Sequence, residues 1–124
     1  MRIKKTSQYI EGGAGLPSYF TDEIDTGMKW IDGKPLYRVV VNIGALPNNS
    51  SKSTTKAITN LNRIIKMSGY AYNGSTTLTI PYSASNPIAL HYHKPSNSVV
   101  IETTSDRSAY TETYITIEYT KTTD

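Results

Sequence analysis

Short segments in which apolar and polar residues alternate constrain the fold of this chain more than any other feature. In residues 37–43, every second position is apolar or aromatic: Tyr37, Val39, Val41 and Ile43. A β-strand directs successive side chains to opposite faces, so these four share one face. No window of a dozen residues places apolar side chains with the period of a helix. The chain is therefore predicted to be all-β.

Further strands are predicted where similar runs lie between Gly, Pro, Asn or Ser residues. In residues 114–119, Ile115, Ile117 and Tyr119 are expected to point inward. The remaining runs cover residues 61–72, 77–82, 88–93 and 98–104. This spacing favours an antiparallel β-sandwich or jelly roll of six to eight strands. Residues 46–53 are expected to form a polar surface loop without an apolar anchor.

The first 27 residues differ in composition, because Glu11-Gly12-Gly13-Ala14-Gly15 suits neither regular element. Residues 1–27 are therefore predicted to be a flexible N-terminal arm, and residues 28–124 the β-sandwich domain. Order in such an arm would require contacts from outside the domain's own core.

Composition excludes several kinds of site. The chain has no cysteine, which rules out disulfides, cysteine metal ligands and a thiol nucleophile. It has no apolar run of about 18 residues, so no membrane insertion is expected. Lys and Arg are scattered singly, whereas a nucleic-acid partner usually requires them on one face. No nucleic-acid partner and no cofactor are predicted.

A hairpin is predicted around Asp32-Gly33, a pair that suits the two positive-φ positions of a type I′ turn. The strand entering the turn would contain Trp30-Ile31, and the strand leaving it Leu36-Tyr37. A single tryptophan beside a tight turn usually fills the edge of a core, so Trp30 is expected to pack over the turn.

The same residues resemble a sequence motif found in phage proteins. Residues 21–38 read TDEIDTGMKWIDGKPLYR, and the other matching segments are 46–49, 64–69 and 116–124. They are similar to the C-terminal β domain of tail-fibre and receptor-binding proteins of phages and prophages of Gram-positive bacteria. The resemblance implies a homotrimer in the virion tail, made in the bacterial host cytoplasm, whose N-terminal arm leads to a shaft or other baseplate proteins. It supplies no catalytic residue.

Residues around the Asn73-Gly74 turn are candidates for contact with a host cell-surface glycan. These are Tyr70, Tyr72, Asn73 and Tyr82. Tyrosine rings can stack on sugar faces while an amide bonds hydroxyl groups. Tyrosines at alternate strand positions also commonly form cross-strand pairs, so structural packing is the competing interpretation.

His91 and His93 share one face of a predicted strand. Two such histidines from each of three chains could bind a transition metal on a threefold axis. Surface histidines are commoner and no third ligand is close in sequence, so no metal is predicted.

The sequence does not predict an enzyme. No nucleophile elbow or phosphate-binding glycine loop is present. The cluster of Asp22, Glu23 and Asp25 suits a solvated turn or the start of a helix better than a pair of general acids. The expected function is a bacteriophage tail structural or receptor-binding module, and the alternative is a monomeric carbohydrate-binding module of a bacterial protein.

Overall fold

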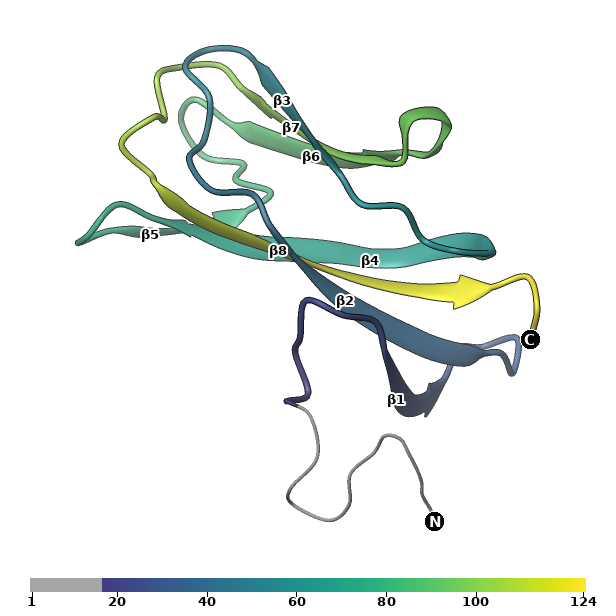
Figure 1. Cartoon of the computed structure of the whole chain (residues 1–124). Coiled ribbons are helices and arrows are strands. Elements are labelled where there is room, and N and C mark those ends of the chain that lie inside the picture. Colours follow the sequence, from purple (N-terminus) through teal and green to yellow (C-terminus); the bar gives the residue numbers. More distant parts are fainter. Residues whose placement is uncertain (1–16) are drawn as a thin grey trace.

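The computed structural model describes residues 17–124, which form two antiparallel sheets packed face to face (Figure 1). The strands are β1 (Ile24–Lys29), β2 (Pro35–Asn42), β3 (Ser51–Thr55), β4 (Leu61–Tyr72), β5 (Thr77–Ile80), β6 (Ile88–His93), β7 (Ser98–Thr103) and β8 (Glu112–Lys121). The larger sheet has the order β1-β2-β8-β4-β5 and the smaller β3-β7-β6. The all-β, two-sheet sandwich predicted from the sequence is confirmed.

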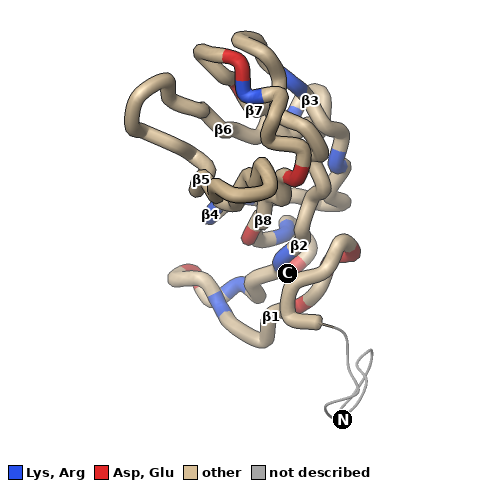
Figure 2. The backbone as a smooth tube through the Cα atoms, turned by 90° about the vertical axis from the view of Figure 1, so that its left-hand side faces the viewer, with Lys and Arg blue, Asp and Glu red and all other residues tan. Residues whose placement is uncertain are grey.

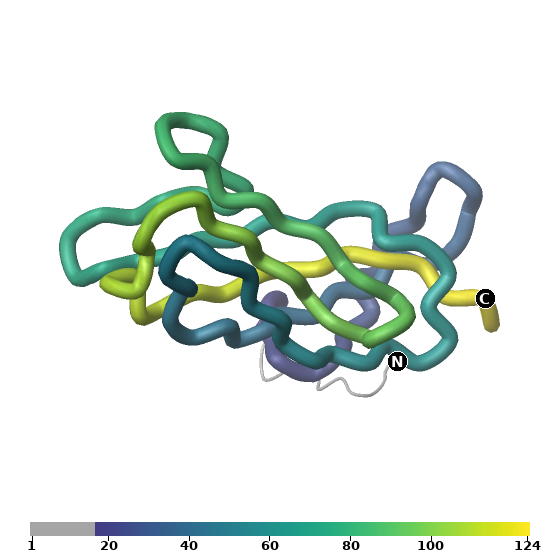
Figure 3. The backbone as a smooth tube through the Cα atoms, turned by 90° about the horizontal axis from the view of Figure 1, so that it is seen from above, coloured from purple at the N-terminus to yellow at the C-terminus, as the bar shows by residue number. Residues whose placement is uncertain are grey.

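The core lies between the sheets, where the inward-facing residues of both meet. Figure 3 shows the smaller sheet lying over the larger one. The buried apolar residues are Val39, Val41, Ile43, Leu46, Leu61, Ala71, Leu78, Ile80, Ile88, Val99, Ile101, Ile115, Ile117 and Tyr119. The alternation in β2 and β8 therefore directs the side chains as the sequence predicted. A single short 3₁₀ helix, Lys94–Ser96, is described in residues 17–124, and no helix there could span a membrane.

The expectation for residues 46–53 was wrong in two respects. Leu46 is buried in the core, and the edge strand β3 begins at Ser51. The strand lacks apolar residues because its two inward positions, opposite buried Ile101 and Val99, are occupied by Lys52 and Thr54. The Lys52 ammonium donates hydrogen bonds to the carbonyl oxygens of Ile43 and Ala45, at 2.8 and 2.7 Å. A satisfied polar group thus replaces the usual apolar side chain.

The N-terminal boundary also differs from the expectation. β1 begins at Ile24, so residues 24–27 belong to the sheet rather than to an arm. Residues 17–23 also contact the domain, because the Val40 amide donates to the Phe20 carbonyl at 2.8 Å. The rest of the predicted arm, residues 1–16, lies outside the described residues.

The predicted hairpin forms, but its turn is different. Gly33 is the only residue of the turn with positive φ (+87°), so the turn is not type I′, which needs two. The Trp30 amide donates to the Lys34 carbonyl, and the Gly33 amide to the Trp30 carbonyl, both at 2.9 Å. Trp30 is exposed rather than filling a core edge.

Gly69 of β4 faces the backbone of the adjacent strand β8 with no room for a side chain. A Cβ atom at this position would overlap the Tyr114 carbonyl oxygen and lie 2.9 Å from the Ile115 Cα. Both are backbone atoms, which cannot move aside as the end of a side chain can. Gly69 therefore sets the separation of these two strands.

Candidate functional site

The outward-facing side of the five-stranded sheet, named here the outer face, carries a row of aromatic and polar residues that could bind a ligand. Directly opposed residues of an antiparallel pair point to the same face. Between β4 and β8 the outward pairs are Lys66 with Glu118, Ser68 with Thr116, Tyr70 with Tyr114 and Tyr72 with Glu112. The intervening residues of β8, including Ile115 and Ile117, point into the core.

An open hollow of about 150 Å³ lies on this face. Its lining residues are Tyr19, Lys66, Ser68, Gly69, Thr116 and Glu118. Pockets that enclose a small molecule usually have volumes of about 300–1,000 Å³. The hollow is therefore suited to one part of a ligand that extends along the sheet, rather than to a whole enclosed molecule.

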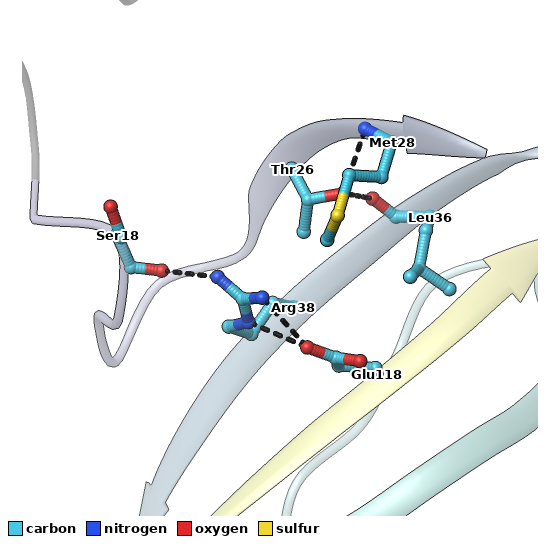
Figure 4. A network of polar contacts seen from close by, with 6 residues as sticks. All are labelled: Ser18, Thr26, Met28, Leu36, Arg38 and Glu118. Atoms are coloured by element: carbon cyan, nitrogen blue, oxygen red, sulfur yellow. Dashed lines mark hydrogen bonds and ion pairs between the residues drawn. The ribbon is translucent and has the colours of Figure 1, made fainter.

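The Tyr19 ring forms one wall of the hollow and is held by Arg38. The Arg38 Cζ atom lies 4.3 Å from the centroid of the ring, within range of a cation–π interaction. Buried Arg38 is fixed in turn by Glu118, whose Oε2 lies 2.9 Å from Nε and 2.7 Å from Nη2. The Nη1 atom of Arg38 donates to the Ser18 carbonyl at 2.9 Å (Figure 4). Tyr19 remains 59% exposed, so much of its surface is open to a ligand.

Three polar groups of the hollow have no hydrogen bond to another described residue. They are the hydroxyl groups of Ser68 and Thr116 and the ammonium group of Lys66. Glu118 uses Oε2 for Arg38, and its Oε1 forms no hydrogen bond with another residue in the range 17–124. The hollow thus offers donors and acceptors side by side next to an aromatic ring.

A second aromatic group lies further along the outer face. The rings of Tyr70 and Tyr114 are 6.1 Å apart, and the Tyr70 hydroxyl donates to Glu112 Oε2 at 2.7 Å. This hydrogen bond, with a smaller contribution from burial, raises the pKa of Tyr70 above its ordinary value. Tyr72 follows on the same face and is exposed. The six residue steps from Lys66 to Tyr72 span about 20 Å at ~3.3 Å per residue.

The four residues predicted to contact a receptor are only partly brought together. Tyr70 and Tyr72 lie on the outer face, but the Asn73 Oδ1 accepts hydrogen bonds from the amides of Ser75 and Thr76, at 2.9 and 2.7 Å. Asn73 therefore holds its own turn.

Tyr82 lies elsewhere, partly buried against the core between the sheets. Its ring centroid is 5.4 Å from the Arg107 guanidinium, and its backbone forms a bridge with Ile88. It is not part of the outer face. Two aromatic residues of the outer face, Tyr19 and Tyr114, were not predicted as site residues from the sequence. The strand pattern that directs Ile115 inward could have identified Tyr114.

His91 and His93 point outward from β6, on the smaller sheet, and both are exposed. His93 Nδ1 lies 2.9 Å from the Ser96 hydroxyl. In residues 17–124, no group of three His, Asp or Glu side chains is arranged to hold a metal.

The acidic cluster near the N-terminus has one well-defined contact set, at Glu23. The buried Tyr119 hydroxyl donates to Glu23 Oε1 at 2.5 Å, and Lys121 donates to Oε2 at 2.6 Å. Burial, followed by this hydrogen bond, raises the pKa of Tyr119. These contacts hold residues 17–23 beside the sheet and thereby help to position Tyr19.

Comparison with protein-family models, with curated proteins and with solved structures gave no match to this chain. Lys and Arg positions are interspersed with Asp and Glu positions along the backbone (Figure 2). The hollow itself has charges of both signs, Lys66 and Glu118, so it is distinguished by aromatic and hydroxyl groups rather than by one sign of charge. The arrangement can stack on an apolar surface and hydrogen-bond its polar rim.

Proposed function

We propose that this domain is a recognition module that binds a saccharide along its outer face. The observation that carries this proposal is the row of Ser68 and Thr116 hydroxyls between two aromatic groups, the Tyr19 ring on one side and the Tyr70–Tyr114 pair on the other. A sugar ring has an apolar C–H face and a rim of hydroxyl groups. Aromatic rings can cover the first while hydroxyl and charged groups bond the second.

We further propose that the module belongs to a phage or prophage tail and presents this face to a glycan on the host surface. The support is the sequence motif of residues 21–38, which corresponds in the structure to the β1–β2 hairpin and the strand that carries Arg38. A homotrimer in the virion is the assembly that this proposal predicts. A monomeric carbohydrate-binding module would use the same outer face, and the mass in solution distinguishes the two.

The test of saccharide binding begins with an array of bacterial cell-wall oligosaccharides and polysaccharides, followed by calorimetry on the strongest ligand. Tyr19→Ala removes the ring, whereas Tyr19→Phe keeps it and serves as the matched control. An aromatic contact contributes about 0.5–1.5 kcal/mol, so Tyr19→Ala is expected to weaken binding by up to about tenfold. Tyr19→Phe should bind like the wild type.

A second pair of variants tests the hydroxyl row. Thr116→Val keeps the shape of the side chain and removes its hydroxyl, while Ser53→Ala makes a comparable change on the outer side of the smaller sheet. Weaker binding by Thr116→Val alone supports the proposal. Binding that tolerates both Tyr19→Ala and Thr116→Val, or no binding to any saccharide on the array, would reject it.

A further inference from the structure

A second surface feature lies at the end of the β1–β2 hairpin, in residues 28–34, named here the hairpin tip. It exposes three large apolar side chains: Met28 is 49% exposed, Trp30 41% and Ile31 90%. The other large apolar or aromatic side chains exposed in residues 17–124 are Tyr19 and Tyr72, both on the outer face. An exposed apolar cluster of this kind usually marks a contact with another molecule.

The hairpin tip is held in one conformation before any partner binds. The turn is closed by the two backbone hydrogen bonds between Trp30 and residues 33 and 34. Asp32 Oδ1 accepts from the Lys34 amide at 3.0 Å, and the Met28 amide donates to the Thr26 hydroxyl at 3.1 Å (Figure 4). Little conformational entropy remains to be lost on docking. In the view from above, the hairpin projects beyond the outline of the two sheets (Figure 3).

The charges on the hairpin tip favour contact with a second copy of the tip over contact with an anionic lipid surface. In residues 28–34, Lys29 and Lys34 stand against one acidic residue, Asp32, so the formal charge of the tip is +1. The Lys34 ammonium is also engaged, because it donates to the carbonyl oxygens of Lys121 and Asp124. An anionic lipid surface would attract an excess of free cations, which the hairpin does not supply. With Lys34 engaged, the remaining charges of the tip are Lys29 and Asp32, which have opposite signs, so two identical tips meet with little electrostatic repulsion.

We propose that the hairpin tip is a self-association contact, in which Met28, Trp30 and Ile31 of each copy pack against the same residues of other copies around a symmetry axis. Large exposed apolar side chains other than tyrosines gather nowhere else in residues 17–124, so another hairpin tip is the best-matched apolar partner that this chain supplies. Closed symmetric assembly uses the same patch on every copy. This contact does not depend on saccharide binding, since the tip and the outer hollow share no residue.

Sedimentation velocity of the full 124-residue chain over a wide range of concentration tests the proposal. Ile31→Lys places a charge where an apolar side chain would be buried between copies, and Ser53→Lys adds the same charge at an exposed position of β3. Ile31→Leu keeps an apolar side chain. We expect oligomers for the wild type, Ile31→Leu and Ser53→Lys, and monomers for Ile31→Lys. A wild type that stays monomeric, or oligomers that survive Ile31→Lys, would overturn it.

Trp30 supplies an independent readout, because it is the only tryptophan of the chain. Its emission maximum should move to shorter wavelength as the wild type assembles and stay constant in Ile31→Lys. Vesicles containing anionic phosphatidylglycerol provide the competing partner. If the Trp30 emission maximum shifts only when vesicles are present and the protein does not self-associate, the proposal is contradicted. It is also contradicted if the protein assembles and Trp30 emission does not change. Loss of oligomers with retained saccharide binding would separate this contact from the proposed function.

Discussion

Replacing Tyr119 with phenylalanine tests how residues 17–23 are held to the sheet. Tyr119 is 1% exposed, and its hydroxyl donates to Glu23 Oε1 at 2.5 Å. A hydrogen bond to a charged group contributes about 1.5–3 kcal/mol. Glu23 has a side chain that is 35% exposed and keeps its contact with Lys121, so its carboxylate can be partly rehydrated in the variant. The expected decrease in the free energy of unfolding is therefore near the lower limit, about 1–2 kcal/mol.

Urea unfolding followed by circular dichroism measures this decrease. An unchanged m value, the slope of the free energy of unfolding against urea concentration, would show that the fold is retained. In thermal unfolding, the same loss should lower the Tm by about 4–10 °C for a domain of this size. Tyr37→Phe is the matched control, because the Tyr37 hydroxyl donates to Asp124 at an exposed site. A decrease for Tyr119→Phe no larger than that for Tyr37→Phe would refute the reasoning.

Three further outcomes are expected. Gly69→Ala should destabilise the domain by about 3 kcal/mol or prevent folding, because its Cβ overlaps the Tyr114 carbonyl; urea unfolding or loss of soluble protein measures this. Ile117→Ala should cost about 2–5 kcal/mol in the same assay, because Ile117 is fully buried between the sheets. The raised pKa values of Tyr37 and Tyr92, caused first by burial, mean that folding favours the neutral phenols. Their contribution to stability is complete below the unfolded pKa of about 10 and is lost as the pH rises above it. In an alkaline titration, the last increase in tyrosinate absorbance should therefore occur at the pH at which the domain unfolds.

The most accurately predicted strands have clearly alternating apolar and polar residues, and residues that favour turns lie at their ends. β4 and β6 have the predicted bounds, 61–72 and 88–93. β3 was missed because its residues are all polar, and the sequence does not reveal that the Lys52 ammonium reaches carbonyl groups of a preceding segment. The exposure of Trp30 was also missed, since a tryptophan beside a turn looks the same in sequence whether it faces the core or solvent.

The candidate site could be predicted where it follows strand periodicity and not where it depends on tertiary contacts. Tyr70 and Tyr72 lie on one face because they are two residues apart in β4. Tyr19 is positioned by a guanidinium from β2, nineteen positions later in the chain, so its role has no local signal. Tyr82 lies beyond the end of β5, where the alternation of that strand no longer determines the direction of a side chain.

The segment by which the backbone enters the described domain is also the segment that carries the Tyr19 ring. Tension applied along the chain ahead of Pro17 would act first on the contacts of Ser18 with Arg38 and of Glu23 with Tyr119. Those contacts hold the ring over the hollow, so a pull strong enough to break them would also remove the aromatic ring from the proposed saccharide site. Binding of the proposed saccharide would then weaken as the mechanical load on the chain increases.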